Sequence, residues 1–221
     1  MMNRAVCMGI CLVGSVMMVS AQKVVCVGDS NTQRGYPAML EKQLGEGWET
    51  LNCGKGGATL LSGTRTPYFG THQYQALLKS EPDVVVIMLG TNDANPLWWK
   101  GKRATQFVGS SAEELISQYQ KLIGEVRSLA TKPKVYVVTP PPVFPDRAKG
   151  EKVTMRAARK ELLETEVLPL IRKVAREEEV ILIDVHGRML GQEQLSSDGV
   201  HFTKKGYELL TSIIKEGLLQ R

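Results

Sequence analysis

The stretch KVVCVGDSNT, residues 23–32, joins a short apolar run to a glycine and three polar residues. A valine-rich run of this length that ends in turn residues is typical of a buried β-strand. Ser30 would then lie just past the strand, at the edge of a sheet where open α/β folds bind ligands. A serine beside a glycine more commonly caps a helix or closes a turn. Ser30 therefore becomes a candidate nucleophile only with support from the rest of the chain.

The same arrangement recurs along the chain. Strands are expected at residues 24–27, 48–52, 83–89, 135–138 and 180–184. Helices are expected at residues 36–44, 71–80, 111–126, 153–178 and from residue 203 onward. Strand and helix alternate five times with no internal repeat or linker, which predicts an α/β fold with one doubly wound, five-stranded parallel sheet and helices on both faces.

Three local signals refine the expected helices. Ser111 and Glu114 have the spacing of a capping box at the start of the third helix. Pro169 predicts a bend in the long fourth helix, because proline lacks the backbone N–H that a helix interior needs. Gly217 is the expected stop of the last helix.

The first residues differ in composition from the rest of the 221-residue chain. Residues 1–4 carry one positive charge, residues 5–19 are apolar, and Val19-Ser20-Ala21 offers a cleavage site of small residues. This layout is typical of a secretory signal peptide. We expect residues 1–21 to be a signal peptide and residues 22–221 to form one exported domain, periplasmic or secreted. An uncleaved N-terminal anchor is the alternative, although the apolar run is short for a membrane span.

Without residues 1–21 the chain keeps 27 basic and 23 acidic residues, a net charge of +4. Basic residues such as Arg156, Arg159 and Lys160 are interleaved with glutamates, a pattern that predicts solvated helix faces and no nucleic-acid partner. Cys26 and Cys53 fall on two neighbouring predicted strands. A disulfide between them is one alternative in an oxidising compartment, and burial as two small core residues is the favoured one.

Two further loops carry polar candidates. Residues 52–59, read NCGKGGAT, are too rich in glycine for regular structure, and glycine lets a ligand approach the backbone closely. The Walker order of a phosphate-binding loop is absent there. Residues 90–93, read GTND, follow the third predicted strand. Because the carboxyl ends of parallel strands share one edge, Ser30, Gly57 and Asn92 are expected to be neighbours.

A serine hydroxyl needs a base to take its proton and a third group that orients the base. His201 follows Asp198 by three residues in the loop before the last helix. This spacing lets the carboxylate reach the ring Nδ1–H while Nε2 faces Ser30. His72 and His186 are expected to be surface or packing residues.

Acyl transfer also needs hydrogen-bond donors for the oxyanion that develops. The backbone N–H groups of Ser30 and Gly57 and the side-chain amide of Asn92 are available in the right loops. The alternative for Asn92 is a turn residue, since asparagine favours turns.

Together these segments resemble the SGNH (GDSL-type) hydrolases. The matching blocks are Gly28-Asp29-Ser30, residues 52–59, Gly90-Thr91-Asn92-Asp93 and Asp198-Gly199-Val200-His201. They occur in the order of the family and span essentially the whole chain after residue 21. The resemblance implies an esterase domain with a flavodoxin-like, three-layer fold, sheet order 2-1-3-4-5, that requires no metal and no organic cofactor. The chain has no Gly-x-Ser-x-Gly, which argues against the ordinary α/β-hydrolase elbow.

The resemblance also implies the roles of the site residues. It assigns a catalytic triad and an oxyanion hole, formed by Ser30, Asp198 and His201 and by Ser30, Gly57 and Asn92. Gly57 is preferred to Gly54 and Gly56 because it stands five residues after Asn52, as in the pattern of the family.

The substrate is predicted from the residues around these blocks. The candidate substrate-binding residues are Asp29, Arg65, Tyr68, Trp98 and Trp99. Flat aromatic faces suit sugar rings and an arginine could hold a polar or acidic substituent, whereas packing of the loops is the alternative for each side chain. The tryptophans after the GTND block look like exported members that remove acetyl groups from glycans.

We therefore expect a serine esterase that removes a small acyl group, acetyl, from a carbohydrate of the xylan, pectin or sialic acid type. A GDSL-type lipase, lysophospholipase or thioesterase is the alternative. A two-metal phosphoesterase is less favoured, because the first strand lacks the Asp-x-His with which such sites begin. Its candidate ligands would be Asp29, Asn92, Asp93 and His201. A non-catalytic glycan-binding module would be expected to have lost Ser30 or His201, and both are present.

Overall fold

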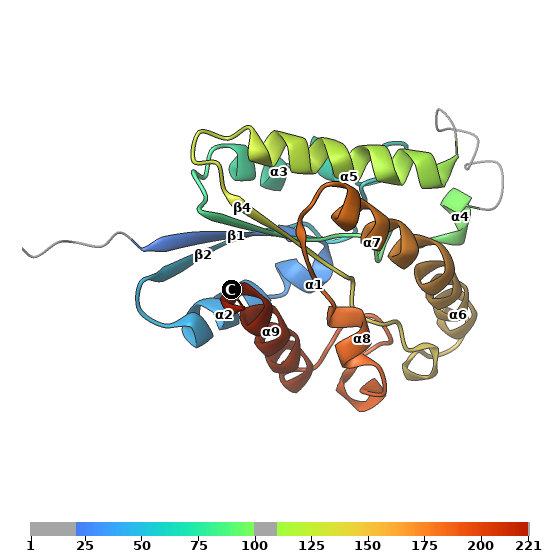
Figure 1. The fold of residues 1–221 in the computed structure, drawn as a ribbon. Coiled ribbons are helices and arrows are strands. Elements are labelled where there is room, and N and C mark those ends of the chain that lie inside the picture. Colours follow the sequence, from blue (N-terminus) through green and yellow to red (C-terminus); the bar gives the residue numbers. More distant parts are fainter. Residues whose placement is uncertain (1–20, 100–109, 221) are drawn as a thin grey trace, which may run out of the picture.

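The computed structural model describes residues 21–99 and 110–220. Within them, five parallel strands form one sheet in the order β2-β1-β3-β4-β5, as the sequence predicts. The strands are β1 (Gln22–Gly28), β2 (Trp48–Gly54), β3 (Val84–Met88), β4 (Lys134–Val138) and β5 (Ile181–Ile183). Helices lie on both sides of the sheet in Figure 1, so the predicted three-layer α/β fold is confirmed.

Two groups of helices cover the two faces of the sheet. One face packs against α3 (His72–Leu78), α5 (Ser111–Arg127) and α7 (Leu168–Glu177). The opposite face packs against α2 (Tyr36–Leu44), α8 (Val185–Met189) and α9 (Lys204–Leu219). The other α-helices of the described chain are α1 (Ser30–Gln33), α4 (Pro96–Trp99) and α6 (Lys152–Leu162).

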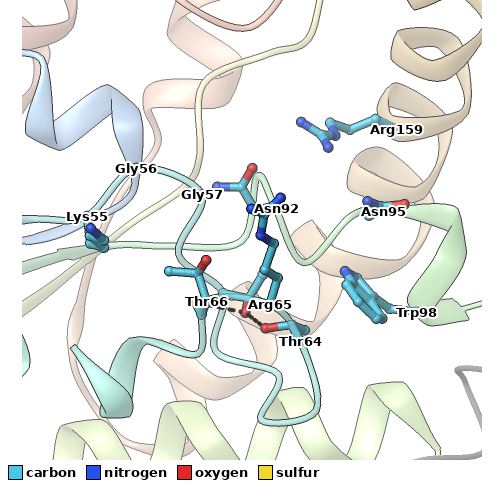
Figure 2. Close-up of a pocket in the computed structure, with 11 residues that line it drawn as sticks. Lys55, Gly56, Gly57, Thr64, Arg65, Thr66, Asn92, Asn95, Trp98 and Arg159 are labelled. Atoms are coloured by element: carbon cyan, nitrogen blue, oxygen red, sulfur yellow. Dashed lines mark hydrogen bonds between the residues drawn. The ribbon is translucent and has the colours of Figure 1, made fainter.

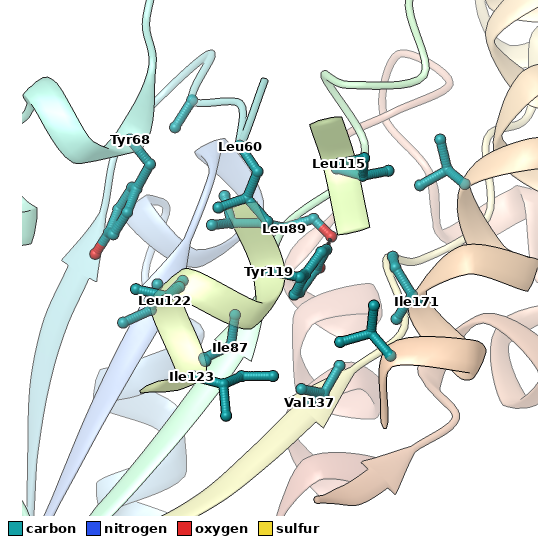
Figure 3. Packing of buried hydrophobic residues seen from close by; sticks show 14 of the residues in the cluster. Leu60, Tyr68, Ile87, Leu89, Leu115, Tyr119, Leu122, Ile123, Val137 and Ile171 are labelled. Atoms are coloured by element: carbon teal, nitrogen blue, oxygen red, sulfur yellow. Dashed lines mark hydrogen bonds between the residues drawn. The ribbon is translucent and has the colours of Figure 1, made fainter. Parts of the chain in front are cut away.

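The apolar run of β1 explains the central place of this strand in the sheet. Val25 and Val27 point into the core beneath α3 and α5, which Figure 3 shows from close by. Val24 and Cys26 point into the other core, beneath α2 and α9. Side chains alternate between the faces of a strand, so a strand covered on both sides must be apolar at every position.

The strand register separates the two cysteines that the sequence places on neighbouring strands. Cys26 pairs with Asn52, whereas Cys53 pairs with Val27, one position further along β1. A shift of one residue turns a side chain to the opposite face, and the two thiols lie in different cores. Both cysteines are free and buried. The disulfide alternative is therefore wrong, and the favoured interpretation as core residues is confirmed.

The capping box of α5 lies one residue earlier than predicted, although the helix itself begins at Ser111. The capping box consists of Ser110 and Glu113, in place of Ser111 and Glu114. Two serines followed by two glutamates give either pair the required spacing, so the pattern alone could not choose. The choice follows from Ser111, whose buried hydroxyl donates to the carbonyl of Trp98 instead.

The long fourth helix, for which the sequence predicts a bend at Pro169, is interrupted just before this proline. A π-helical turn, Leu163–Val167, separates α6 from α7, and this wider turn accommodates the missing N–H and the bulk of the proline ring. The predicted stop at Gly217 is wrong, because α9 continues to Leu219. Gly217 packs so closely on β5 that an added Cβ would lie 2.6 Å from Ile183.

The predicted signal peptide falls on residues 1–20, outside the described residues, and on Ala21. Its cleavage stays a prediction. Among the helices of the described ranges, none has both the length and the apolar character needed to cross a membrane.

The burial of both thiols gives a first testable prediction. Burial raises the pKa of Cys26 to about 12 and that of Cys53 to about 11, and a protonated, inaccessible thiol reacts slowly. In protein that begins at Gln22, we expect neither thiol to react with Ellman's reagent in the native state and both to react after unfolding in guanidinium without reductant. Recovery of no thiol after unfolding would instead show a disulfide.

Candidate active site

The structure brings Ser30, His201 and Asp198 together from the two ends of the chain. Ser30 is the first residue of α1, directly after β1, and its Oγ lies 2.9 Å from Nε2 of His201. The other ring nitrogen of His201, Nδ1, lies 2.7 Å from Oδ2 of Asp198. These are hydrogen-bonding distances in the order nucleophile, base and carboxylate, which is the arrangement that activates a serine hydroxyl.

The loop that carries His201 is folded around the side chain of Asp198. Oδ1 of Asp198 accepts hydrogen bonds from the backbone N–H groups of Val200 at 3.0 Å and His201 at 2.8 Å. Between Asp198 and Val200, Gly199 has a φ of 90°, and a Cβ there would lie 2.6 Å from the carbonyl oxygen of Phe144. The Asp-Gly-Val-His sequence thus meets a turn that needs a carboxylate acceptor and a glycine.

The protonation state of Asp198 determines the role of the histidine ring. Although burial alone would raise the pKa of Asp198, hydrogen bonds from the backbone and ring of His201 and from the backbone of Val200 lower it to about 2. An ionised carboxylate can only accept hydrogen bonds, so Nδ1 of His201 must carry a hydrogen. This tautomer leaves the Nε2 lone pair free to take the proton of Ser30.

Backbone hydrogen bonding singles out Gly57 in the glycine-rich loop. The neighbouring N–H groups are used inside the protein: Gly54 donates to Asn52 Oδ1, Lys55 to the carbonyl of Gly28, Gly56 to Gln33 Oε1 and Ala58 to the carbonyl of Lys55. In the part of the chain that the structure describes, the Gly57 N–H has no acceptor. Its φ of 76° is favoured by glycine. The geometry therefore favours Gly57 over Gly54 and Gly56 as the oxyanion donor.

The other two predicted oxyanion donors have similarly free hydrogens. The N–H of Ser30 belongs to the first residue of α1, where a helix offers no internal acceptor. The side-chain Nδ2 of Asn92 donates one hydrogen to the carbonyl of Ala58 at 3.1 Å. This hydrogen bond orients the amide and leaves its second hydrogen available for a substrate oxygen. Three donors from the loops after β1, β2 and β3 can thus converge on one oxygen.

Two buried carboxylates lie behind these donors. Asp29 is 1% exposed and accepts from the N–H of Asn31, so it caps α1 and cannot contact a substrate, contrary to the sequence prediction. Asp93 is fully buried, and its Oδ1 accepts from the N–H groups of Leu60 and Leu61. Burial raises the pKa of Asp93 to about 7 and also raises that of Asp29. Both acids support the loops of the site from within.

The structure divides the remaining substrate-binding candidates. Tyr68 is fully buried and its hydroxyl donates to the carbonyl of Cys53, so its predicted contact with substrate is wrong. Trp99 donates from its indole to the carbonyl of Asp93, which fits the alternative of loop packing. Arg65 and Trp98 do line a cavity, whose walls also include Gly57 and Asn92.

This cavity has a volume of about 440 Å³ and opens onto the oxyanion donors. Figure 2 shows the side chains around it. The described residues that line it are Lys55, Gly56, Gly57, Thr59, Thr64, Arg65, Thr66, Asn92, Asn95, Trp98 and Arg159. Most of the side chains are polar or cationic.

Two residues near the site were not predicted from the sequence. Arg159 was expected on a solvated helix face, but its side chain extends from α6 toward the cavity (Figure 2). The charge pattern of α6 could not show this position, because the other residues that line the cavity come from segments far away in the sequence. Gln33 accepts a hydrogen bond from the backbone N–H of Gly56 through its side-chain Oε1. Its position in the sequence, three residues after Ser30, was the signal that could have suggested a role near the site.

The two other histidines have the places that the sequence predicts. His72 is exposed at the first position of α3, and His186 is buried in α8. Neither takes part in the arrangement around Ser30.

Fold and geometry together define a serine hydrolase of the three-layer α/β type, with the nucleophile directly after the first strand. The chain belongs to the GDSL-like lipase/acylhydrolase family, whose pattern it matches over residues 26–209. The resemblance to the SGNH hydrolases is confirmed.

Known proteins similar to this chain include esterases. An acetylxylan esterase from Xylanibacter ruminicola is 30% identical over 212 residues, which cover 88% of this chain and 42% of that protein. The chain thus spans less than half of this relative. A carbohydrate acetylesterase family member from Sinorhizobium meliloti has a similar fold, with a TM-score of 0.65 and 19% identity over 89% of this chain and 97% of that one. An aryl esterase from M. smegmatis has a TM-score of 0.65 and 21% identity over 90% and 98% of the two chains.

A change of Asp198 to asparagine tests the proposed tautomer. The amide keeps an oxygen for the backbone N–H groups but turns an NH₂ toward the ring, so Nδ1 must accept and Nε2 must carry the hydrogen. We expect kcat on an ester substrate to fall by about 10³ to 10⁴, with the melting temperature little changed. The exposed Asp146→Asn variant is the control, and near-normal turnover by Asp198→Asn would contradict the role of Asp198.

A second change tests the oxyanion hole. Asn92→Ala removes a donor that acts on the developing charge, so we expect kcat to fall by about 10² to 10³ with little change in KM. Asn95→Ser is the matched control, because Asn95 lines the same cavity but caps α4 through the N–H of Leu97. Equal kinetics for the two variants would remove Asn92 from the oxyanion hole.

Proposed function

We propose that this protein is a serine esterase that removes acetyl groups from a carbohydrate through an acyl-enzyme. The observation that carries the proposal is the polar cavity of about 440 Å³ whose lining includes the predicted oxyanion donors Gly57 and Asn92. A cavity of this kind accepts a hydrophilic ring next to the reacting ester.

The proposed cycle begins when Ser30 Oγ attacks the ester carbonyl while Nε2 of His201 takes its proton. The new oxyanion receives hydrogen bonds from Ser30, Gly57 and Asn92, and the charged Asp198 stabilises the imidazolium. His201 then protonates the sugar oxygen, which leaves, and Ser30 carries the acetyl group. Water, activated by His201, releases acetate and restores the serine.

The composition of the cavity supports a short acyl group. A long acyl chain needs apolar walls, and Trp98 is the one large apolar side chain among the described residues that line the cavity. Threonine, asparagine and arginine side chains supply the hydrogen bonds that sugar hydroxyls accept and donate. The acetylxylan esterase relative gives independent support for an acetylated glycan. Lipase or thioesterase activity is the less well supported alternative.

We further propose that the protein is exported. The charged residues 1–4, the apolar residues 5–19 and the small residues up to Ala21 support this location.

Acetate release tests the proposed function. Purified protein would be incubated with p-nitrophenyl acetate, a p-nitrophenyl ester of a long fatty acid, and acetylated xylan, pectin and sialoside. We expect release from the short ester and at least one glycan, and a loss of about 10⁴ or more in Ser30→Ala. A fluorophosphonate should add covalently to Ser30 and to no other serine.

Ser128→Ala is the control, because Ser128 caps the end of α5 at the opposite edge of the sheet. Preference for the long-chain ester would replace the proposal by a lipase. Equal activity of Ser30→Ala and the wild type would refute a serine mechanism.

A further inference from the structure

Three cations line the cavity beside the oxyanion donors. They are Lys55, Arg65 and Arg159, and no aspartate or glutamate is among the described residues that line it. Within the described chain none of the three side chains forms an ion pair or a hydrogen bond. The cavity therefore presents positive charge that no described residue neutralises at close range.

Some basic residues on the helix surfaces are paired with acids, unlike the cations at the cavity. On the helix surfaces, lysines face glutamates one turn away, as in Lys160–Glu164, Lys173–Glu177 and Lys204–Glu208. The three cations at the cavity share one pocket whose described lining holds no acidic residue, and this grouping indicates a ligand with negative charge.

Arg159 is the most constrained of the three cations. It is half-buried on α6, and Figure 2 shows its guanidinium directed from the helix toward Asn92. Burial and the charge of the neighbouring Arg156 lower the pKa of Arg159, while Asp29 and Asp93 act in the opposite direction from within the protein. Neither acid is within ion-pair distance of it. Arg156 itself has a buried Nε without an acceptor in the described chain, so positive charge accumulates here.

We propose that the substrate is an acetylated acidic sugar, a uronate or sialate unit, and that Arg65 and Arg159 bind its carboxylate. This inference rests on the proposed deacetylation and names its substrate class. Gly57 and Asn92 belong both to the oxyanion hole and to the cavity wall, so an acetyl group in the hole places its sugar between the cations. The planar fork of a guanidinium matches the two oxygens of a carboxylate.

The test compares substrates that differ only in this charge. The purified protein would act on O-acetylated polygalacturonate and on the same polymer with its carboxylates methyl-esterified, with acetate release as the measurement. A second pair would be an O-acetylated sialoside and its methyl ester, which distinguishes the two sources of the carboxylate. We expect kcat/KM to favour the acid form of at least one pair by about tenfold, mainly through KM. The preference should shrink in 0.5 M salt.

Variants assign that preference to residues. We expect the ratio of kcat/KM between acid and methyl ester to fall toward one in Arg65→Gln plus Arg159→Gln, and partly in each single variant. Arg65 is exposed, so Arg65→Gln tests the inference even where a change of Arg159 disturbs folding. The control is Arg176→Gln, an exposed arginine in the last turn of α7, which should keep the wild-type ratio.

The outcomes separate this inference from the proposed function. Equal kcat/KM on both members of both pairs, or a wild-type ratio in the double variant, would overturn the carboxylate site while acetate release upholds the esterase. Failure to release acetate from any glycan or from p-nitrophenyl acetate would overturn the proposed function and this inference with it.

Discussion

One carboxylate, that of Asp198, holds the catalytic histidine through both its backbone and its ring. Oδ1 accepts the N–H of His201 and Oδ2 faces the ring Nδ1. The position of the ring relative to its own loop is therefore determined before the ring meets Ser30. Because these hydrogen bonds are made to the ionised form, the same contacts that shape the loop also keep the pKa of Asp198 low. The hydrogen bonds of Asp198 therefore both fold the loop and prepare His201 to accept a proton.

The oxyanion donors depend on a second carboxylate, which lies deeper. Asp93 follows β3 and accepts two backbone N–H groups from the loop after β2, so it fixes the distance between the loops of Gly57 and Asn92. Burial of a carboxylate disfavours its charged form, and burial raises the pKa of Asp93 to about 7. The neutral acid is accessible near neutral pH, which limits the free-energy cost of this buried link. Donors held in this way need not reorganise when the oxyanion forms.

Much of the fold could be predicted from the sequence for a simple physical reason. The apolar runs are buried on both faces of a parallel sheet, and the carboxyl ends of such strands meet at one edge, so Ser30, Gly57 and Asn92 had to be neighbours. The Asp-x-x-His spacing is local and could likewise be read from the chain. The strand register, by contrast, could not be predicted from the sequence. Cys53 is an example, because only the pairing of β1 with β2 places it on the opposite face of the sheet from Cys26.

The positions of side chains that depend on contacts with distant segments also could not be predicted from the sequence. Tyr68 lies in a loop rich in polar residues, yet its hydroxyl finds the carbonyl of Cys53 and the ring is buried. Arg159 shows the reverse, because its helix has the charge pattern of a solvated face although a wall of the cavity lies opposite. In both cases the partner comes from another loop, and a pattern within one segment carries no information about it.

The position of Arg159 bears on what binding energy can achieve at this site. A cation beside the oxyanion hole attracts a substrate carboxylate in the ground state and the oxyanion in the transition state. Only attraction that becomes stronger as the oxyanion forms raises kcat. Attraction that is equal in the ground state and in the transition state lowers KM alone. Asn92 and Gly57 are placed to act on the developing charge. Arg159 reaches the cavity from α6, and the buried Asp29 and Asp93 favour its charged form. A permanent cation at this position suits a substrate carboxylate, whose charge does not change during the reaction. On the proposed function, Gly57 and Asn92 would therefore act in catalysis, whereas Arg159 would act in selection of an acidic sugar.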